Sequence, residues 1–212
     1  MGTKRVGLAR TQALVENLKR ELTLTTGTSI TVGEIKSTTG INTTAQMEAG
    51  TGIAIVPTAA RHSVVKVGNV FHTQIVLDLA GLESAGSADK IIGNSTDANA
   101  TIGQITTAVN GTIMAGRVTC LETPTTGEDD IDLYSSTAAT CSSGDVAAGM
   151  TGLVALMEAG QNWIGTLSAN QFNVSGIATV PAADSYLYLV SSGGNSAGTY
   201  GTGKFLIELW GY

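Results

Sequence analysis

A chain of 212 residues with 42% hydrophobic side chains can bury a core, which excludes a chain that is disordered throughout. Only 13% of the residues are charged, two are histidine and two are cysteine, and the formal net charge is −6. Enzymes assemble their acids, bases, nucleophiles and metal ligands from such residues. The composition therefore favours a structural or binding protein over an enzyme.

Residues 8–22 (LARTQALVENLKREL) form the first predicted element, an amphipathic helix. Apolar side chains recur along one side at helical spacing, and charged side chains occupy the other side. The apolar positions are Leu14, Val15, Leu18 and Leu22. The helix either packs on its own domain or acts as an assembly arm that packs on a neighbouring subunit. We name these four residues as candidate assembly contacts.

The charge is unevenly distributed along the chain. Residues 1–36 hold six basic and three acidic side chains, whereas the remainder holds five basic and fourteen acidic ones. The two parts are therefore expected to face different surroundings, although the basic excess is too small for an arm that binds nucleic acid. The sequence has no secretory signal, and no apolar run approaches the roughly 18 residues of a membrane span. We expect neither a nucleic-acid partner nor a membrane.

Residues 23–60 are rich in Thr and Gly and have weak periodicity, which is typical of a linker, an extended arm or a small hairpin region. Strand-like sequence follows at residues 64–70 and 71–79, and in the second of these apolar and polar side chains alternate. Further predicted strands, separated by clusters of Gly, Asn, Ser and Asp, are residues 103–109, 111–120, 131–134, 162–167, 185–190 and 205–212. One short helix is predicted within residues 149–160.

Short strands at this spacing predict a mainly β protein, either a sandwich or a barrel. We expect an antiparallel β-sandwich, jelly-roll-like, over residues 61–212. An N-terminal helix and an extended Thr/Gly-rich arm precede it, over residues 1–60.

Residues 198–204 (GTYGTGK) match the first part of a phosphate-binding loop. Phe205 stands where the motif needs Ser or Thr, and the sequence that follows is strand-like, so no helix N-terminus is available to hold a phosphate. We interpret this segment as a glycine-rich hairpin turn.

The acidic run Glu128–Asp132 lacks the spacing of an EF-hand, and we interpret it as a solvated loop tip rather than a calcium site. His62 and His72 have no clustered partners for a metal site, and His72 falls on the polar side of its strand as an ordinary exposed histidine. Cys120 and Cys141 either pair or remain buried free thiols, and free thiols are favoured. We expect no cofactor and no metal.

Six of the ten aromatic residues lie in the last 27 positions. They form either the densest part of the sandwich core, which is the favoured interpretation, or a platform on which sugar rings stack. A glycosidase would need two facing carboxylates, and the sequence identifies no such pair.

Several stretches of the chain resemble a family of virion structural proteins of tailed bacteriophages, chiefly those of marine bacteria. They are MGTKRVGLARTQALVENLKREL, HTQIVLDLAGL, IGQITTAVNGTIMAGRVTCLETP, DIDLYSS, PAADSYLYLVSSGG and AGTYGTGKFLIELWGY. The resemblance spans nearly the whole chain but brings few functional motifs with it. It implies a non-enzymatic component of the virion, assembled in the host cytoplasm.

Two roles on the particle follow as hypotheses. The first is a capsid decoration (cement) protein, a homo-oligomer that stabilises the head by bridging capsid subunits, with the major capsid protein as its main partner. The alternative is a tail- or fibre-associated protein, an adhesin whose C-terminal aromatic residues contact host glycans. An enzyme is the least favoured class.

Overall fold

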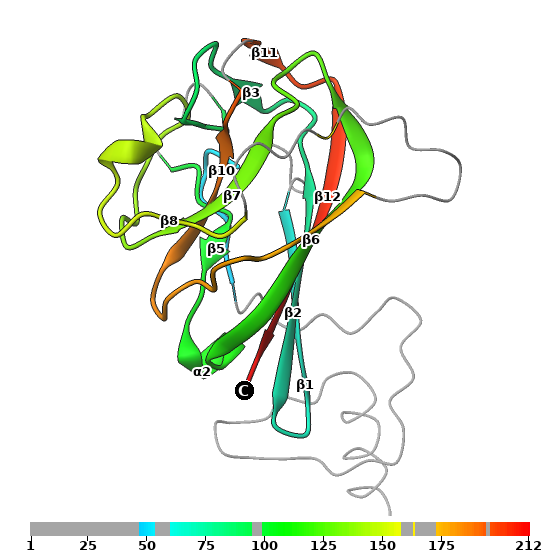
Figure 1. Cartoon of the computed structure of the whole chain (residues 1–212), viewed down its shortest axis with the longest axis vertical. Coiled ribbons are helices and arrows are strands. Elements are labelled where there is room, and N and C mark those ends of the chain that lie inside the picture. The colour runs from blue at the N-terminus through cyan, green and yellow to red at the C-terminus, as the bar shows by residue number, and fades with distance from the viewer. Residues whose placement is uncertain (1–46, 54–59, 95–98, 158–162, 164–172, 194–195) are drawn as a thin grey trace, which may run out of the picture. The chain divides into compact units, whose positions relative to one another are not determined.

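Figure 1 shows the computed structural model, which describes residues 47–53, 60–94, 99–157, 163, 173–193 and 196–212. The predicted helix at residues 8–22, with the candidate contacts Leu14, Val15, Leu18 and Leu22, lies outside these residues. So does the predicted strand at residues 162–167, apart from Trp163. All the described residues belong to one compact unit, Thr43–Tyr212.

The fold is mainly antiparallel β, as predicted, because every strand pairing in the described residues is antiparallel. The first sheet has the strand order β1-β2-β12-β6-β9. Its strands are β1 (Ala60–Val67), β2 (Val70–Asp78), β12 (Thr202–Gly211), β6 (Ile113–Thr125) and β9 (Asn173–Gly176). A two-residue turn joins β1 to β2, and Gly68 supplies the positive φ of 62° that such a turn requires.

The second sheet has the order β4-β10-β7-β8, and β5 also pairs with β10. Its strands are β4 (Lys90–Ile91), β10 (Tyr186–Ser191), β7 (Ile131–Ser136), β8 (Val154–Ala155) and β5 (Gly103–Gln104). A separate small ribbon pairs β3 (Glu83–Ser84) with β11 (Gly198–Thr199). Figure 1 shows this ribbon at one end of the strands and the turn of the β1–β2 hairpin at the other.

One hydrophobic core joins the two sheets, an arrangement consistent with a β-sandwich. Alternate residues of β2 and β12 point into it, and Ile75, Leu77, Phe205, Ile207 and Leu209 are almost fully buried. Leu133, Leu187 and Leu189 come from the second sheet. Burial of one such side chain stabilises the fold by roughly 1.5–3 kcal/mol. The burial of Ile75 and Leu77, on either side of the exposed Val76, confirms the alternation predicted for residues 71–79.

Trp163 connects the sheets. Its ring meets Phe205 of β12 edge-on, with the ring centroids 5.2 Å apart and the planes at 76°. Its indole Nε1 donates a hydrogen bond of 2.7 Å to the carbonyl of Ile131, where β7 begins. One buried side chain thus contacts a strand of each sheet.

Two predicted elements are wrong. The strand predicted at residues 103–109 ends with β5, because the short helix α2 (Thr107–Asn110) follows. The Thr106 side chain caps this helix by accepting a hydrogen bond from the Val109 amide, and Asn110 Oδ1 accepts one from the Thr106 amide. These local hydrogen bonds outweigh the strand propensity of the segment.

The helix predicted at residues 149–160 is also absent from the described part, residues 149–157. A 3₁₀ turn, η1 (Ala147–Gly149), precedes β8 there. Leu156 and Met157 are buried, and the Leu156 amide donates to the Leu133 carbonyl at 2.9 Å. Pairing with β7 and burial in the core therefore decide the conformation of this segment rather than its helix propensity.

The core also includes residues from the segment predicted as an arm. Met47 and Ile53 are 3% and 0% exposed and belong to the core cluster. The Gly50 amide donates to the Thr101 carbonyl at 2.8 Å. The core thus includes residues that precede position 61. No helix among the described residues is long and apolar enough to cross a membrane.

Candidate functional site

The outer face of the first sheet, which points away from the core, carries a concentration of charged and exposed apolar side chains. Residues that lie directly opposite each other in antiparallel strands point to the same face. The register therefore places Ser63, Gln74, Glu208 and Arg117 in one row across four strands. Val65, His72, Trp210 and Ala115 form the adjacent row. These two rows form the centre of the candidate site.

Glu208 is the centre of a charged cluster on this face. Its side chain is only 5% exposed; Arg117 Nε pairs with Oε2, and His72 Nε2 lies 3.1 Å from Oε1. Burial raises the pKa of Glu208, but the hydrogen bond and charge of Arg117 and the hydrogen bonds of His72 and Gln74 lower it below its usual value. Glu208 is therefore ionised and fully paired at neutral pH. A general acid needs the opposite shift, so this cluster suits a structural role.

Trp210 lies between its neighbours on the flanking strands. His72 from β2 stacks on it, with the ring centroids 5.2 Å apart and the planes at 8°. The Arg117 guanidinium from β6, on the other side of β12, lies 5.7 Å from the ring centroid. The prediction that His72 is an ordinary exposed histidine is therefore wrong, because the side chain is both stacked and hydrogen-bonded. His72 and Arg117 thus cover part of Trp210, which is half-buried on the outer face.

The other C-terminal aromatic residues support the core interpretation. Tyr188, Tyr200 and Phe205 are at most 2% exposed. The Tyr188 hydroxyl donates to the Ala138 carbonyl and the Tyr200 hydroxyl to the Glu128 carbonyl, each at 2.7 Å. Tyr212, by contrast, is 65% exposed. Tyr188, Tyr200 and Phe205 therefore fill the core rather than form a stacking platform.

Four valines on the outer face of β1 and β2 are exposed. The relative exposure is 49% for Val65, 72% for Val67, and 38% for both Val70 and Val76. The register places all four on the same face, with Val67 directly opposite Val70. We refer to Val65, Val67, Val70 and Val76 as the valine strip. Val65, Val67 and Val70 adjoin one another near the hairpin turn, whereas Val76 lies further along β2, opposite Arg61. Adjoining exposed apolar side chains mark surfaces that contact other proteins.

The prediction that Glu128–Asp132 is a solvated loop tip is wrong at both ends of the run. Glu128 is 3% exposed and Asp132 is 1% exposed. Glu128 Oε1 accepts hydrogen bonds from the amides of Asp129 and Asp130 at 3.2 and 3.3 Å, and Oε2 accepts one from the Ser196 amide at 3.2 Å. The Ser192 hydroxyl donates to Asp132. The run is thus tied to the loop that precedes β11.

Asp130 is the unusual member of this run, because its buried Oδ1 has no hydrogen-bond partner. Burial raises the pKa of Asp130, and the charges of Asp132, Glu128 and Asp129 raise it further. No group of three or more Asp, Glu, His or Cys side chains is arranged to hold a metal ion within the described ranges. The neighbouring carboxylates therefore make the ionised form of Asp130 less favourable.

The segment that resembles a phosphate-binding loop leads into strand β12, so the helix that a phosphate would need is not present there. It is a turn but not a hairpin, because β11 pairs with β3 whereas β12 pairs with β2 and β6. Lys204 forms ion pairs with Glu122 and, at 3.8 Å, with Asp78. The Lys204 ammonium is therefore paired with carboxylates on the surface of the sheet.

Both cysteines are free and buried, as favoured from the sequence. Burial raises the pKa of Cys120 to about 11 and also raises the pKa of Cys141. Neither thiol is therefore ionised at neutral pH, and neither is a reactive nucleophile.

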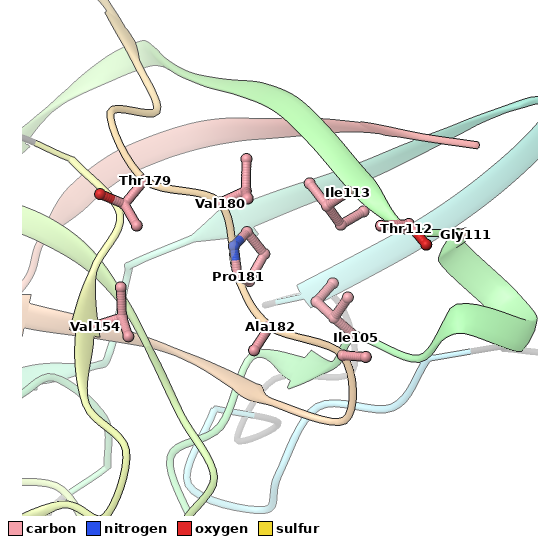
Figure 2. A pocket seen from close by; sticks show the side chains of 10 residues that line it. Ile105, Gly111, Thr112, Ile113, Val154, Thr179, Val180, Pro181 and Ala182 are labelled. Atoms are coloured by element: carbon pink, nitrogen blue, oxygen red, sulfur yellow. The ribbon is translucent and has the colours of Figure 1, made fainter.

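Figure 2 shows an apolar pocket between the start of β6, strand β8 and residues 179–183. Its volume is about 330 Å³, and Ile105, Ile113, Val154 and Pro181 line it. The lining contains no ionisable side chain, and Thr112 and Thr179 carry its only side-chain hydroxyls. The pocket therefore lacks the convergent polar groups that orient a substrate.

Sequence reasoning missed the two features that dominate the outer face. Arg117 and Glu208 are 91 positions apart, and His72 and Glu208 are 136 apart, so no local motif could join them. The valine strip did leave a signal, because Val64–Val67 places valines on both faces of one strand.

Comparisons with family models, curated proteins and solved structures gave no match.

Proposed function

We propose that this protein is a non-enzymatic structural component of a tailed-phage virion, a decoration protein that stabilises the head from outside. In this role a jelly-roll-like sandwich bridges capsid subunits, with the major capsid protein as its main partner. The valine strip carries the proposal, because exposed valines on an otherwise regular sheet are suited to contact with a neighbouring protein.

The state of the ionisable groups supports a contact role over catalysis. Glu208 is held ionised by its partners, Lys204 is engaged by two carboxylates, and both thiols are protonated at neutral pH. Glu208 and Lys204 are thus engaged by neighbouring side chains within the sheet, and its exposed valines are left to make contacts. The resemblance of the chain to phage virion proteins points to the same class of function.

Deletion of the gene from the phage tests the proposal. A decoration protein bridges a shell that forms without it, and many weak symmetric contacts together give a large stabilisation. Particles without the protein should therefore assemble, package DNA and keep their tails, but release DNA at a lower temperature or after milder osmotic shock. Heads of normal heat resistance combined with failed adsorption to the host would contradict the head role. That result would favour the tail-associated alternative.

A further inference from the structure

We propose that two copies of this chain associate through their β1 strands, so that the first sheet continues across a twofold axis. β1 lies at the end of the strand order. Among the described residues, no strand pairs with its outward side. Its eight residues pair with β2 in an unbroken register, without proline, glycine or bulge. Monomeric proteins usually protect such long regular edges, because their free amide and carbonyl groups can pair with another chain.

The two cations of β1 do not prevent this pairing. Arg61 lies on the outer face, opposite Val76, whereas Lys66 lies on the inner side, opposite Phe71. The Lys66 ammonium is 4.5 Å from the centroid of the Phe71 ring. A twofold axis perpendicular to the sheet brings together only residues of the same face. Arg61 of one copy therefore never lies opposite Lys66 of the other in such a dimer.

A register centred on Val64 pairs every residue from Arg61 to Val67 with the second copy. It places Ser63 opposite Val65 and Arg61 opposite Val67, so two residues of the valine strip gain cross-strand contacts in each copy. Lys66 lies opposite His62, whose burial lowers its pKa and keeps it neutral. The pairing thus covers exposed apolar surface without opposing like charges.

The distribution of charge along the chain favours the same surface for association of two copies. The net charge is −6, so two copies repel each other in general. Residues 60–77 contain Arg61 and Lys66 and no acid. The β1–β2 hairpin is therefore a surface on which two acidic copies can meet with little repulsion.

The inference deepens the proposed function by defining the oligomer that would bridge capsid subunits. Its test needs only the purified full chain, so the dimer and the head role can fail separately. A single strand pair is a small interface, and association with a Kd on the order of 10 µM is expected.

Sedimentation equilibrium over a range of concentrations measures the dimer. Val65→Lys should weaken association at least about tenfold, because two lysines then enter the shared strand pair. Val146→Lys is the matched control: Val146 is exposed to the same degree, 50% against 49% for Val65, but lies outside the first sheet. The control should dimerise like the wild type, and circular dichroism should show that both variants are folded. A wild type that stays monomeric up to 1 mM (about 100 times the expected Kd), or equal association of both variants, would overturn the inference.

A pair of cysteines tests the register. Ser63→Cys combined with Val65→Cys should give a disulfide-linked dimer under mild oxidation, because opposite residues approach closely enough for a disulfide. The native cysteines are buried and should not compete. Each single variant should remain unlinked. No cross-link in the double variant at concentrations where the wild type dimerises would overturn the pairing of β1 strands in this register.

Discussion

Arg117 and Glu208 lie directly opposite each other on β6 and β12 and form an ion pair, although 91 positions separate them in the sequence. Glu208 is buried beneath this pair and its neighbours on the outer face. The carboxylate of Glu208 on β12 is fixed by side chains of the two flanking strands, Arg117 of β6 and His72 of β2. The same face continues into the valine strip at the edge of the sheet.

Arg117→Ala should destabilise the protein by about 1–2 kcal/mol at pH 7, because it leaves a buried carboxylate with fewer partners while solvent partly compensates. The sign of the pH dependence follows from the lowered pKa of Glu208. The pair stabilises the fold above the ordinary value of 4.5, and this contribution is lost as the pH falls through the lower folded value. The difference between wild type and variant in urea unfolding should therefore shrink below about pH 4.

Lys204→Ala provides the contrasting control on the same face. Its ion pairs with Glu122 and Asp78 are exposed to solvent. Such pairs contribute little, so the melting temperature should stay unchanged. Equal losses of stability in Arg117→Ala and Lys204→Ala would show that the burial of Glu208 does not make its ion pair stronger than the exposed pairs of Lys204.

Asp130→Asn should stabilise the protein at neutral pH. The raised pKa means that the folded state binds the Asp130 proton more tightly than the unfolded state does, so the ionised carboxylate costs stability as the pH rises above 3.8. The amide removes that cost, and the gain in melting temperature should disappear near pH 3. Asp184→Asn, at an exposed loop position, controls for the general effect of net charge. A loss of stability at pH 7 in Asp130→Asn would indicate that the carboxylate has a favourable partner.

Trp163→Ala should cost about 3–5 kcal/mol, since it removes a large buried ring that contacts Phe205 and a hydrogen bond to Ile131. Tyr212→Ala, which truncates a largely exposed ring, should change stability by less than about 0.5 kcal/mol. Denaturant unfolding measures both. A small effect of Trp163→Ala would contradict its role as a link between the two sheets.

Addition of a chelator should leave the melting temperature unchanged. A metal bound only by the folded state would add stability that chelation removes. The buried carboxylates of Glu128 and Asp132 instead accept hydrogen bonds from amides and a hydroxyl. A fall of more than a few degrees would point to a cation held by the acidic run.

The local pattern was sufficient to predict much of the fold. Alternation in residues 71–79 identified β2 and its buried face, and the apolar side chains of Phe205, Ile207 and Leu209 identified β12. Where hydrogen bonds or packing from elsewhere dominate, the sequence misled, as at α2 and β8. The burial of Glu128 depends on the distant residues Ser84, Ser196 and Tyr200, which no local pattern reveals.

The candidate site was the least predictable part for the same reason. Its charged cluster draws one residue from each of three strands, and its valine strip becomes visible only when the register of β1 and β2 is known. Composition favours a protein of contacts over an enzyme, and this stays a prediction. Composition could not locate the surface that we propose for such contacts.

Electron cryo-microscopy of an intact virion, from the tailed phage proposed to encode this chain, tests the central proposal most directly. We expect density for the β-rich unit on the outside of the head, at symmetric positions between capsid subunits, with copies adjacent through the β1–β2 hairpin. Purified particles that lack the chain, or density confined to the tail, would contradict it.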